Sequence, residues 1–263
     1  MSFFDRRRPR VYAHRGGCAL GPENTVAAFE IGLGTGADGL ELDVQLAADG
    51  IPVVIHDDTL DRTTGATGLV SARTADELAR VDAGCRFVDG SGGRPFAGLG
   101  IGVSTLLAVL RRFDNVPVII ELKVDTEDCG RRVAEVVHAA DAVERVCLAG
   151  AGWHSARGAR AALPGAAASA CRPEVRLAMH RSWVAWPVRR VAYGGYQVPE
   201  RSGVWRVATR RFIRHAHAAG LAVEVWTVDE PADMERLLGW GVDGLISNRP
   251  DLAVAVRNRV SAG

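Results

Sequence analysis

The sequence of 263 residues has no long hydrophobic run, and this absence excludes the simplest membrane architectures. None of its apolar stretches approaches the roughly 18 residues that a membrane-spanning helix needs. Arginines lie near the N-terminus, but no apolar segment follows them, so we expect no export by a signal peptide. The formal net charge of +1 disfavours a broad nucleic-acid interface, and we expect no nucleic-acid partner.

Cysteine and lysine are both scarce. The five cysteines are odd in number and widely spaced, and no C-x-x-C motif occurs. This pattern disfavours a disulfide framework or a structural zinc site, and it predicts a cytoplasmic protein with free thiols. Of the 32 basic residues, Lys123 alone is a lysine and the others are arginines.

Short apolar runs alternate with longer helical stretches along a chain of ordinary globular composition. The runs expected to be strands are 11–13, 39–44, 51–55, 116–122, 146–149, 166–170, 193–198, 221–226 and 242–246. The expected helices cover about 23–36, 104–113, 126–140, 155–163, 207–219 and 231–239. Such alternation predicts a parallel α/β fold. About eight strands without a G-x-G-x-x-G turn favour a closed (β/α)8 TIM barrel over a doubly wound sheet.

Two segments break the alternation. Residues 43–51 leave no room for a crossover helix, and Asp49-Gly50 is typical of a two-residue hairpin turn, which would place Asp43 opposite His56. Residues 57–102 are polar and glycine-rich, with one short helix near 75–81, and are too long for an ordinary loop. We therefore expect one TIM-barrel domain over residues 1–263, with a small insertion at about 57–102, after the third strand.

Charged motifs lie at the ends of the first four expected strands. They are His14-Arg15-Gly16, Glu41-x-Asp43, His56-Asp57 and Glu121-x-Lys123. The carboxyl ends of barrel strands meet around one mouth, where catalytic groups converge. A single strand-end histidine or carboxylate pair is usually structural. Four such motifs favour a functional site, because buried charge is costly unless it is paired or bound to metal.

The spacing of these motifs indicates their chemistry. Side chains alternate along a strand, so Glu41 and Asp43 share one face, as do Glu121 and Lys123. Converging carboxylates suit a hard divalent cation such as Mg2+ or Ca2+.

Two histidines and two further cations complete the predicted site. His14 and His56 suit general acid and base catalysis near neutral pH. Arg15 and Lys123 suit a phosphate-bearing anion. Together with the carboxylates they indicate metal-assisted cleavage of a phosphate ester. The alternative is a structural ion-pair network around the barrel mouth.

Longer motifs carry a family resemblance. H-R-G is followed by P-E-N-T and then by G-A-D-G-L-E-L-D-V-Q-L-A-A-D-G-I-P-V-V-I-H-D-D-T-L-D-R-T-T-G, so that residues 13–65 match almost without interruption. Downstream, E-L-K at 121–123, W-T-V at 226–228, G-V-D-G at 241–244 and N-R-P-D at 248–251 follow in the right order. The sequence thus resembles the glycerophosphodiester phosphodiesterase family.

The resemblance implies a TIM barrel that hydrolyses glycerophosphodiesters to an alcohol and glycerol 3-phosphate, with a small-molecule substrate and one Mg2+ or Ca2+ ion. The residues then have the following implied roles: His14 and His56 in acid–base catalysis, Glu41, Asp43 and Glu121 as metal ligands, Arg15 and Lys123 as phosphate contacts, and Trp226 as a wall of the pocket. Alanines and glycines at 149–152 replace the Ser-Phe pair usual in the family, which affects the expected headgroup pocket.

Some alternatives stay open at this level. A phospholipase-D-like barrel acting on lysophospholipids or sphingolipids is a second enzymatic interpretation, and a catalytically silent phosphodiester-binding barrel is a third. The intact histidines and carboxylates argue against the third.

Residues 181–196 are unusually aromatic and basic. Helix packing with a solvated basic face is the favoured explanation, and transient lipid contact is the other. The headgroup, the physiological metal, the roles of the two histidines and the oligomeric state are not determined.

Overall fold

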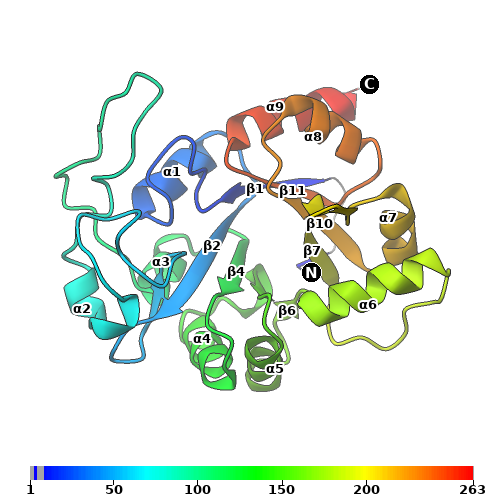
Figure 1. Ribbon diagram of the computed structural model, residues 1–263, viewed down its shortest axis with the longest axis horizontal. Coiled ribbons are helices and arrows are strands. Elements are labelled where there is room, and N and C mark those ends of the chain that lie inside the picture. The colour runs from blue at the N-terminus through cyan, green and yellow to red at the C-terminus, as the bar shows by residue number, and fades with distance from the viewer. Residues whose placement is uncertain (1–2, 5–8, 263) are drawn as a thin grey trace.

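The protein is a parallel barrel surrounded by helices (Figure 1). A computed structural model describes residues 3–4 and 9–262. In this part of the chain, eight parallel strands follow the order β6-β5-β4-β2-β1-β11-β10-β7. The two ends of this order meet through a parallel bridge between Ser169 and Gly195. The predicted TIM barrel is therefore confirmed.

The elements follow one another with a helix after each barrel strand. The strands are β1 (Arg10–His14), β2 (Gly39–Leu46), β3 (Pro52–Val54), β4 (Val118–Leu122), β5 (Val146–Ala149), β6 (Ala167–Ala168), β7 (Gly195–Pro199), β8 (Arg201–Ser202), β9 (Trp205–Arg206), β10 (Ala222–Trp226) and β11 (Gly244–Ser247). The helices are α1 (Val26–Gly34), α2 (Ala75–Leu78), α3 (Leu106–Arg112), α4 (Glu127–Ala139), α5 (Trp153–Ala162), α6 (Arg172–Trp183), α7 (Arg210–His217), α8 (Pro231–Leu238) and α9 (Pro250–Ala262). Two 3-10 turns cover Val70–Ala72 and Val143–Arg145.

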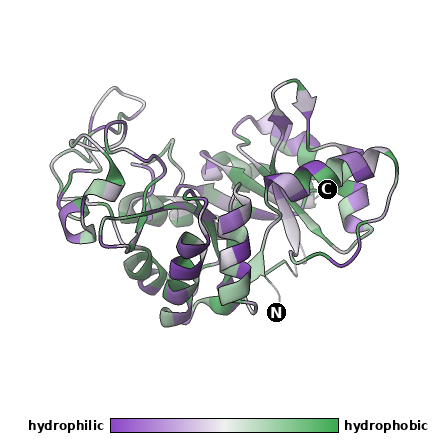
Figure 2. Cartoon of the chain, turned by 60° about the horizontal axis from the view of Figure 1, so that its bottom comes forward, coloured by the Kyte–Doolittle hydropathy of each residue, from purple (hydrophilic) through white to green (hydrophobic). Residues whose placement is uncertain are grey.

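Alternation along the strands separates the core from the site. In β2, Leu40, Leu42 and Val44 pack in the apolar core shared with the helices. The residues between them, Glu41 and Asp43, therefore point into the barrel. In Figure 2 the central strands are mostly green, whereas the helices are green on one side and purple on the other. The carboxylate pair is thus placed by the same pattern that builds the core.

Threonine side chains fix the starts of several helices. Thr25, Thr105, Thr126 and Thr209 each accept a hydrogen bond from the backbone N–H three residues later, at the starts of α1, α3, α4 and α7. This satisfies one of the N–H groups that a helix leaves free at its first turn. The helices therefore begin at positions that the sequence encodes locally.

The hairpin between β2 and β3 differs from the expected register by one residue. Val44 pairs with Val54, and the N–H of Ile55 donates to the carbonyl of Asp43 at 3.0 Å. Asp43 therefore faces Ile55 and not His56. The reason is the turn, which has three residues, because Ala47 pairs with Ile51 and Gly50 takes a positive φ of 74°.

Residues 57–102 lie between β3 and α3, beside the barrel (Figure 1). They contain one 3-10 turn and α2, and they share a small apolar core that includes Leu60, Val70 and Leu78. Helices α6 and α9 and the β8–β9 hairpin were not among the expected elements. In the described part of the chain, no helix combines the length and apolar character needed to cross a bilayer.

The contact between α4 and α5 gives a test of the packing. A Cβ at Gly158 would lie 2.7 Å from the Cα of Glu127 and still closer to its carbonyl oxygen. The crowding should cost about 1–3 kcal/mol. Because this cost exceeds the gain of up to about 1 kcal/mol that alanine brings in a helix, Gly158→Ala should lower the free energy of unfolding. Chemical denaturation measures the difference.

Gly34 is the matched control, since it also lies in a helix but has open space around its Cβ position. Gly34→Ala should leave stability unchanged or raise it by up to about 1 kcal/mol. A Gly158→Ala protein as stable as Gly34→Ala would show that α4 and α5 do not pack this closely.

Candidate active site

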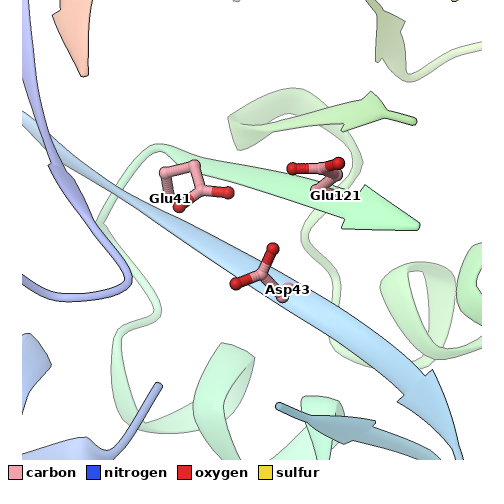
Figure 3. Close-up of side chains that lie close together, drawn as sticks. All are labelled: Glu41, Asp43 and Glu121. Atoms are coloured by element: carbon pink, nitrogen blue, oxygen red, sulfur yellow. The ribbon is translucent and has the colours of Figure 1, made fainter. Parts of the chain in front are cut away.

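Three carboxylates converge at the mouth of the barrel. Glu41 and Asp43 extend from β2, and Glu121 extends from the neighbouring strand β4 (Figure 3). One oxygen of each lies within 4.8 Å of the others. Asp43 is paired with Glu121 in the parallel register, which brings the two side chains together. The three predicted metal ligands therefore form one cluster.

Two cations enclose Asp43, which is fully buried. The Nζ of Lys123 lies 2.9 Å from Asp43 Oδ1 and 3.0 Å from Glu121 Oε1. The Nε of Arg15 lies 3.1 Å from Asp43 Oδ2, which also accepts a hydrogen bond from Asn24 Nδ2 at 2.8 Å. Lys123 thus bridges two members of the cluster, and Arg15 neutralises Asp43 from the other side.

The carboxyl groups of the cluster differ in their ionisation. Burial would raise the pKa of Asp43, but the charges of Lys123 and Arg15 outweigh it and hold that pKa below its ordinary value. Burial raises the pKa of Glu41 well above its ordinary value, and the charges of Asp43 and Glu121 raise it further. Glu41 is therefore the carboxyl that gains most from an additional positive charge nearby.

This donor set fits a hard divalent cation. All three groups supply carboxylate oxygens, which Mg2+ and Ca2+ prefer. The raised pKa of Glu41 points the same way, because a bound cation would favour its ionised form. The residues present thus fit the ion that the sequence predicted.

His14 lies beside Glu41 and is oriented by Asn248. Its Nε2 is 3.8 Å from Glu41 Oε2, and its Nδ1 is 2.6 Å from Asn248 Oδ1. The Nδ2 of Asn248 donates to Asp229 at 2.7 Å, which turns the amide oxygen toward His14. His14 Nδ1 therefore carries the proton, and Nε2 faces the carboxylates. Burial, followed by the charge of Arg15, lowers the pKa of His14.

His56 has a charged partner instead. Its Nδ1 lies 2.6 Å from Asp57 Oδ1, and Arg62 donates to both oxygens of Asp57 at 2.6 and 2.9 Å. The hydrogen bond from Arg62, with that from His56, lowers the pKa of Asp57 to about 2. The carboxylate beside His56 thus stays ionised over the physiological range.

Glu23 links the two halves of the site. It accepts hydrogen bonds from Arg15 at 3.0 Å and from Arg62 at 2.7 and 2.8 Å. A chain of ion pairs therefore runs from Asp43 through Arg15, Glu23 and Arg62 toward His56. Because Arg62 belongs to residues 57–102, this segment is held against the barrel mouth by the same charges.

The loop after β1 has an unusual backbone that serves this arrangement. Arg15 has φ 51° and its N–H donates to Glu41 Oε2 at 3.0 Å. Gly16 follows with φ 87°, and a Cβ there would lie 2.8 Å from Ala28 and Phe29 of α1. Only glycine satisfies both conditions without strain. The H-R-G motif thus directs the backbone and the side chain of Arg15 to adjacent carboxylates.

A cavity of about 520 Å³ opens over the cluster. His14, Arg15, His56, Lys123 and Trp226 line it together with Glu41 and Glu121. Ala149, Gly150 and Ala151, at the end of β5 and just after it, are small residues, which leaves room on that side. The outer wall is formed by α6 and by Ser202 of the β8–β9 hairpin.

The structure thus brings all eight predicted site residues to one cavity or its buried floor. Sequence reasoning gave no role to Asn24, Asn248, Asp229, Glu23 or Arg62, although four of them lie within the matched motifs. The available signal was their polar character beside strand ends. It did not specify their partners, since His14 and Asn248 are 234 residues apart.

Comparison with known proteins shows the family of this chain. A model of the glycerophosphoryl diester phosphodiesterase family matches residues 14–252. A glycerophosphodiester phosphodiesterase from Caldanaerobacter subterraneus is 30% identical over 259 residues, which cover 93% of this chain and 96% of that protein.

Solved structures resemble the whole chain as well. The crystal structure of a glycerophosphodiester phosphodiesterase from Agrobacterium tumefaciens matches with a TM-score of 0.74 at 28% identity, over 94% of this chain and 99% of that chain. An Oleispira antarctica phosphodiesterase in complex with the product sn-glycerol-3-phosphate shares the fold, with a TM-score of 0.75 at 23% identity over 95% and 97% of the two chains. Because the family model covers most of the sequence, this protein belongs to the glycerophosphoryl diester phosphodiesterase family.

Proposed function

We propose that the protein hydrolyses glycerophosphodiesters to an alcohol and glycerol 3-phosphate, with one divalent cation and two histidines, acting as a single TIM-barrel domain in the cytoplasm. The observation that carries the proposal is the convergence of three carboxylates, two cations and two histidines on one cavity. The family supplies the reaction class. Trp226, 40% exposed at the cavity wall, offers an apolar surface to the substrate.

The charged residues have separable tasks in this mechanism. Glu41, Asp43 and Glu121 would hold the cation, which polarises the phosphodiester and neutralises charge on its oxygens. Arg15 and Lys123 would bind the remaining phosphate oxygens. Because the side chains of Arg15 and Lys123 are already held by Asp43, they need little reorganisation when the substrate binds.

The hydrogen-bond partners suggest how the histidines divide the proton transfers. The carboxylate of Asp57 accepts a hydrogen bond from His56 Nδ1 and orients the ring, so we assign His56 to the leaving alcohol as the general acid. His14 faces a neutral amide that holds the proton on Nδ1, which leaves Nε2 free to accept one. We therefore assign His14 as the general base that activates the attacking hydroxyl.

The first prediction concerns the cation. A chelator should abolish release of glycerol 3-phosphate, and Mg2+ or Ca2+ should restore it. The same ion should raise the melting temperature, because binding to the folded state alone stabilises that state. Glu121→Gln should remove most of this thermal shift. Asp76→Asn, which alters an exposed carboxylate in α2, should retain it. Full turnover in excess chelator would contradict the mechanism.

The second prediction separates the histidines by the leaving group. His14→Ala and His56→Ala should each lose about 10²–10⁴-fold in turnover of an alkyl glycerophosphodiester. On the p-nitrophenyl ester of glycerol 3-phosphate, the leaving phenolate needs no proton. His56→Ala should then recover most of its activity, whereas His14→Ala should not.

The reverse pattern would exchange the two assignments. Near-normal turnover of the alkyl substrate by either variant would remove that histidine from the chemistry.

The third prediction concerns Lys123. Its compact ammonium fits between Asp43 and Glu121, where a planar guanidinium would displace one of them. Lys123→Arg should keep the fold but lose at least about tenfold in kcat/KM, or about 1.4 kcal/mol of transition-state stabilisation. Kinetics within twofold of the parent at unchanged melting temperature would show that positive charge alone suffices.

A further inference from the structure

The segment 172–214 concentrates positive charge on one part of the molecule. It contains ten arginines, two glutamates and no aspartate or lysine, so its formal charge is +8, although the whole chain carries only +1. Both glutamates are already paired, Glu174 with Arg160 and Glu200 with Arg206. Internal neutralisation therefore leaves most of this charge uncompensated.

Large apolar side chains are exposed in the same segment. Trp183, at the end of α6, and Trp205, in β9, lie with ring centroids 5.7 Å apart, and both are exposed. Val184 and Trp186 directly follow α6 and are 71% and 65% exposed. Arg211 donates to the carbonyl of Trp183 at 3.3 Å, and α6 lies beside α7 (Figure 1). We call the following set the basic–aromatic face: Trp183, Val184, Trp186, Arg201, Val204, Trp205, Arg206 and Arg211.

The β8–β9 hairpin has a composition that disfavours its own stability. Arg201 lies directly opposite Arg206 in the hairpin register, and like charges in that position destabilise a strand pair. The hairpin has only two short strands, which are marginal on their own. Its tip exposes Val204 to 87%, the largest exposure of a large apolar side chain in the described residues. These features do little for the stability of the hairpin, but they suit contact with another surface.

The basic–aromatic face borders the mouth of the catalytic cavity. One face of α6, with Val175, Arg176 and Met179, lines the cavity. Trp183 follows Met179 by four residues and so continues the same helix face outward. Ser202 of the neighbouring hairpin lines the cavity as well. A surface that meets this face would therefore lie at the entrance to the active site.

We propose that the basic–aromatic face docks on the surface of an anionic lipid bilayer. Tryptophan is favoured at the membrane–water interface, and arginine is attracted to anionic headgroups. Val184 and Val204 offer nothing to phosphates or stacked bases, but they can insert at the acyl boundary. This favours a lipid surface over a nucleic acid. Docking goes beyond the proposed reaction and does not depend on it.

Cosedimentation with vesicles tests the proposal without any substrate. Vesicles of phosphatidylcholine alone are compared with vesicles of phosphatidylcholine and phosphatidylglycerol at about 0.1 M and about 0.5 M salt. The protein should bind the anionic vesicles several-fold better, and high salt should weaken binding because it screens the charges. Equal binding to both vesicles, no binding, or tighter binding to a single-stranded oligonucleotide would overturn the proposal.

A matched pair of double variants locates the contact. Val204→Asp with Trp205→Ser should weaken binding to the anionic vesicles at least about fivefold, the effect of one unit charge near the membrane surface. Leu99→Asp with Leu69→Ser makes equivalent changes at exposed apolar residues of the segment 57–102 and should leave binding unchanged. Equal loss in both pairs, or no loss in the first, would overturn the assignment of this face.

Turnover of a small glycerophosphodiester and the melting temperature serve as controls, and both variants should retain them. If the hairpin double variant melts at a lower temperature, vesicle binding is measured with the single variant Val204→Asp. This change should not affect folding, because the side chain lies almost entirely in solvent. Unchanged vesicle binding by a stable Val204→Asp protein would then contradict the proposal.

Discussion

Three carboxylates beside one another at a barrel mouth repel one another and lose the hydration of their charges. Such an arrangement persists only with compensating positive charge or with a proton on one of the carboxyl groups. Lys123 and Arg15 supply part of this charge through Asp43, and Glu41 still has a raised pKa. The site compensates for this deficit locally, because the loop after β1 supplies Arg15, β4 is followed by Lys123, and Glu23 orients Arg15.

The charge compensation also explains how distant segments are held together. Arg15 reaches Asp43 only because the loop after β1 turns through positive φ values, and Gly16 makes that turn against α1. Glu23 then joins Arg15 to Arg62, which fixes Asp57 beside His56. The segment 57–102 thus contributes to the site through ion pairs, in addition to the small apolar core that it shares with the β2–β3 hairpin.

The two sides of the cavity differ in character. The floor is made by barrel strands and is strongly constrained by paired charges. The outer wall is made by α6 and the β8–β9 hairpin, where arginines and exposed tryptophans gather without a matching set of acids. The proposed chemistry uses the floor, and the proposed contact with a lipid surface uses the wall.

The sequence alone determined the barrel, the four strand-end motifs and the shared face of Glu41 and Asp43, because strand alternation and capping are local properties. The tertiary structure decided the rest. Asn248 orients His14 across 234 residues of sequence, and no local pattern specifies such a partner. The β2–β3 register shifted by one residue because Gly50 takes a positive φ within a three-residue turn. Helix α6 was not predicted because its sequence lacks a clear apolar face. Its inner face lines a cavity and carries arginine where a core helix would carry apolar residues.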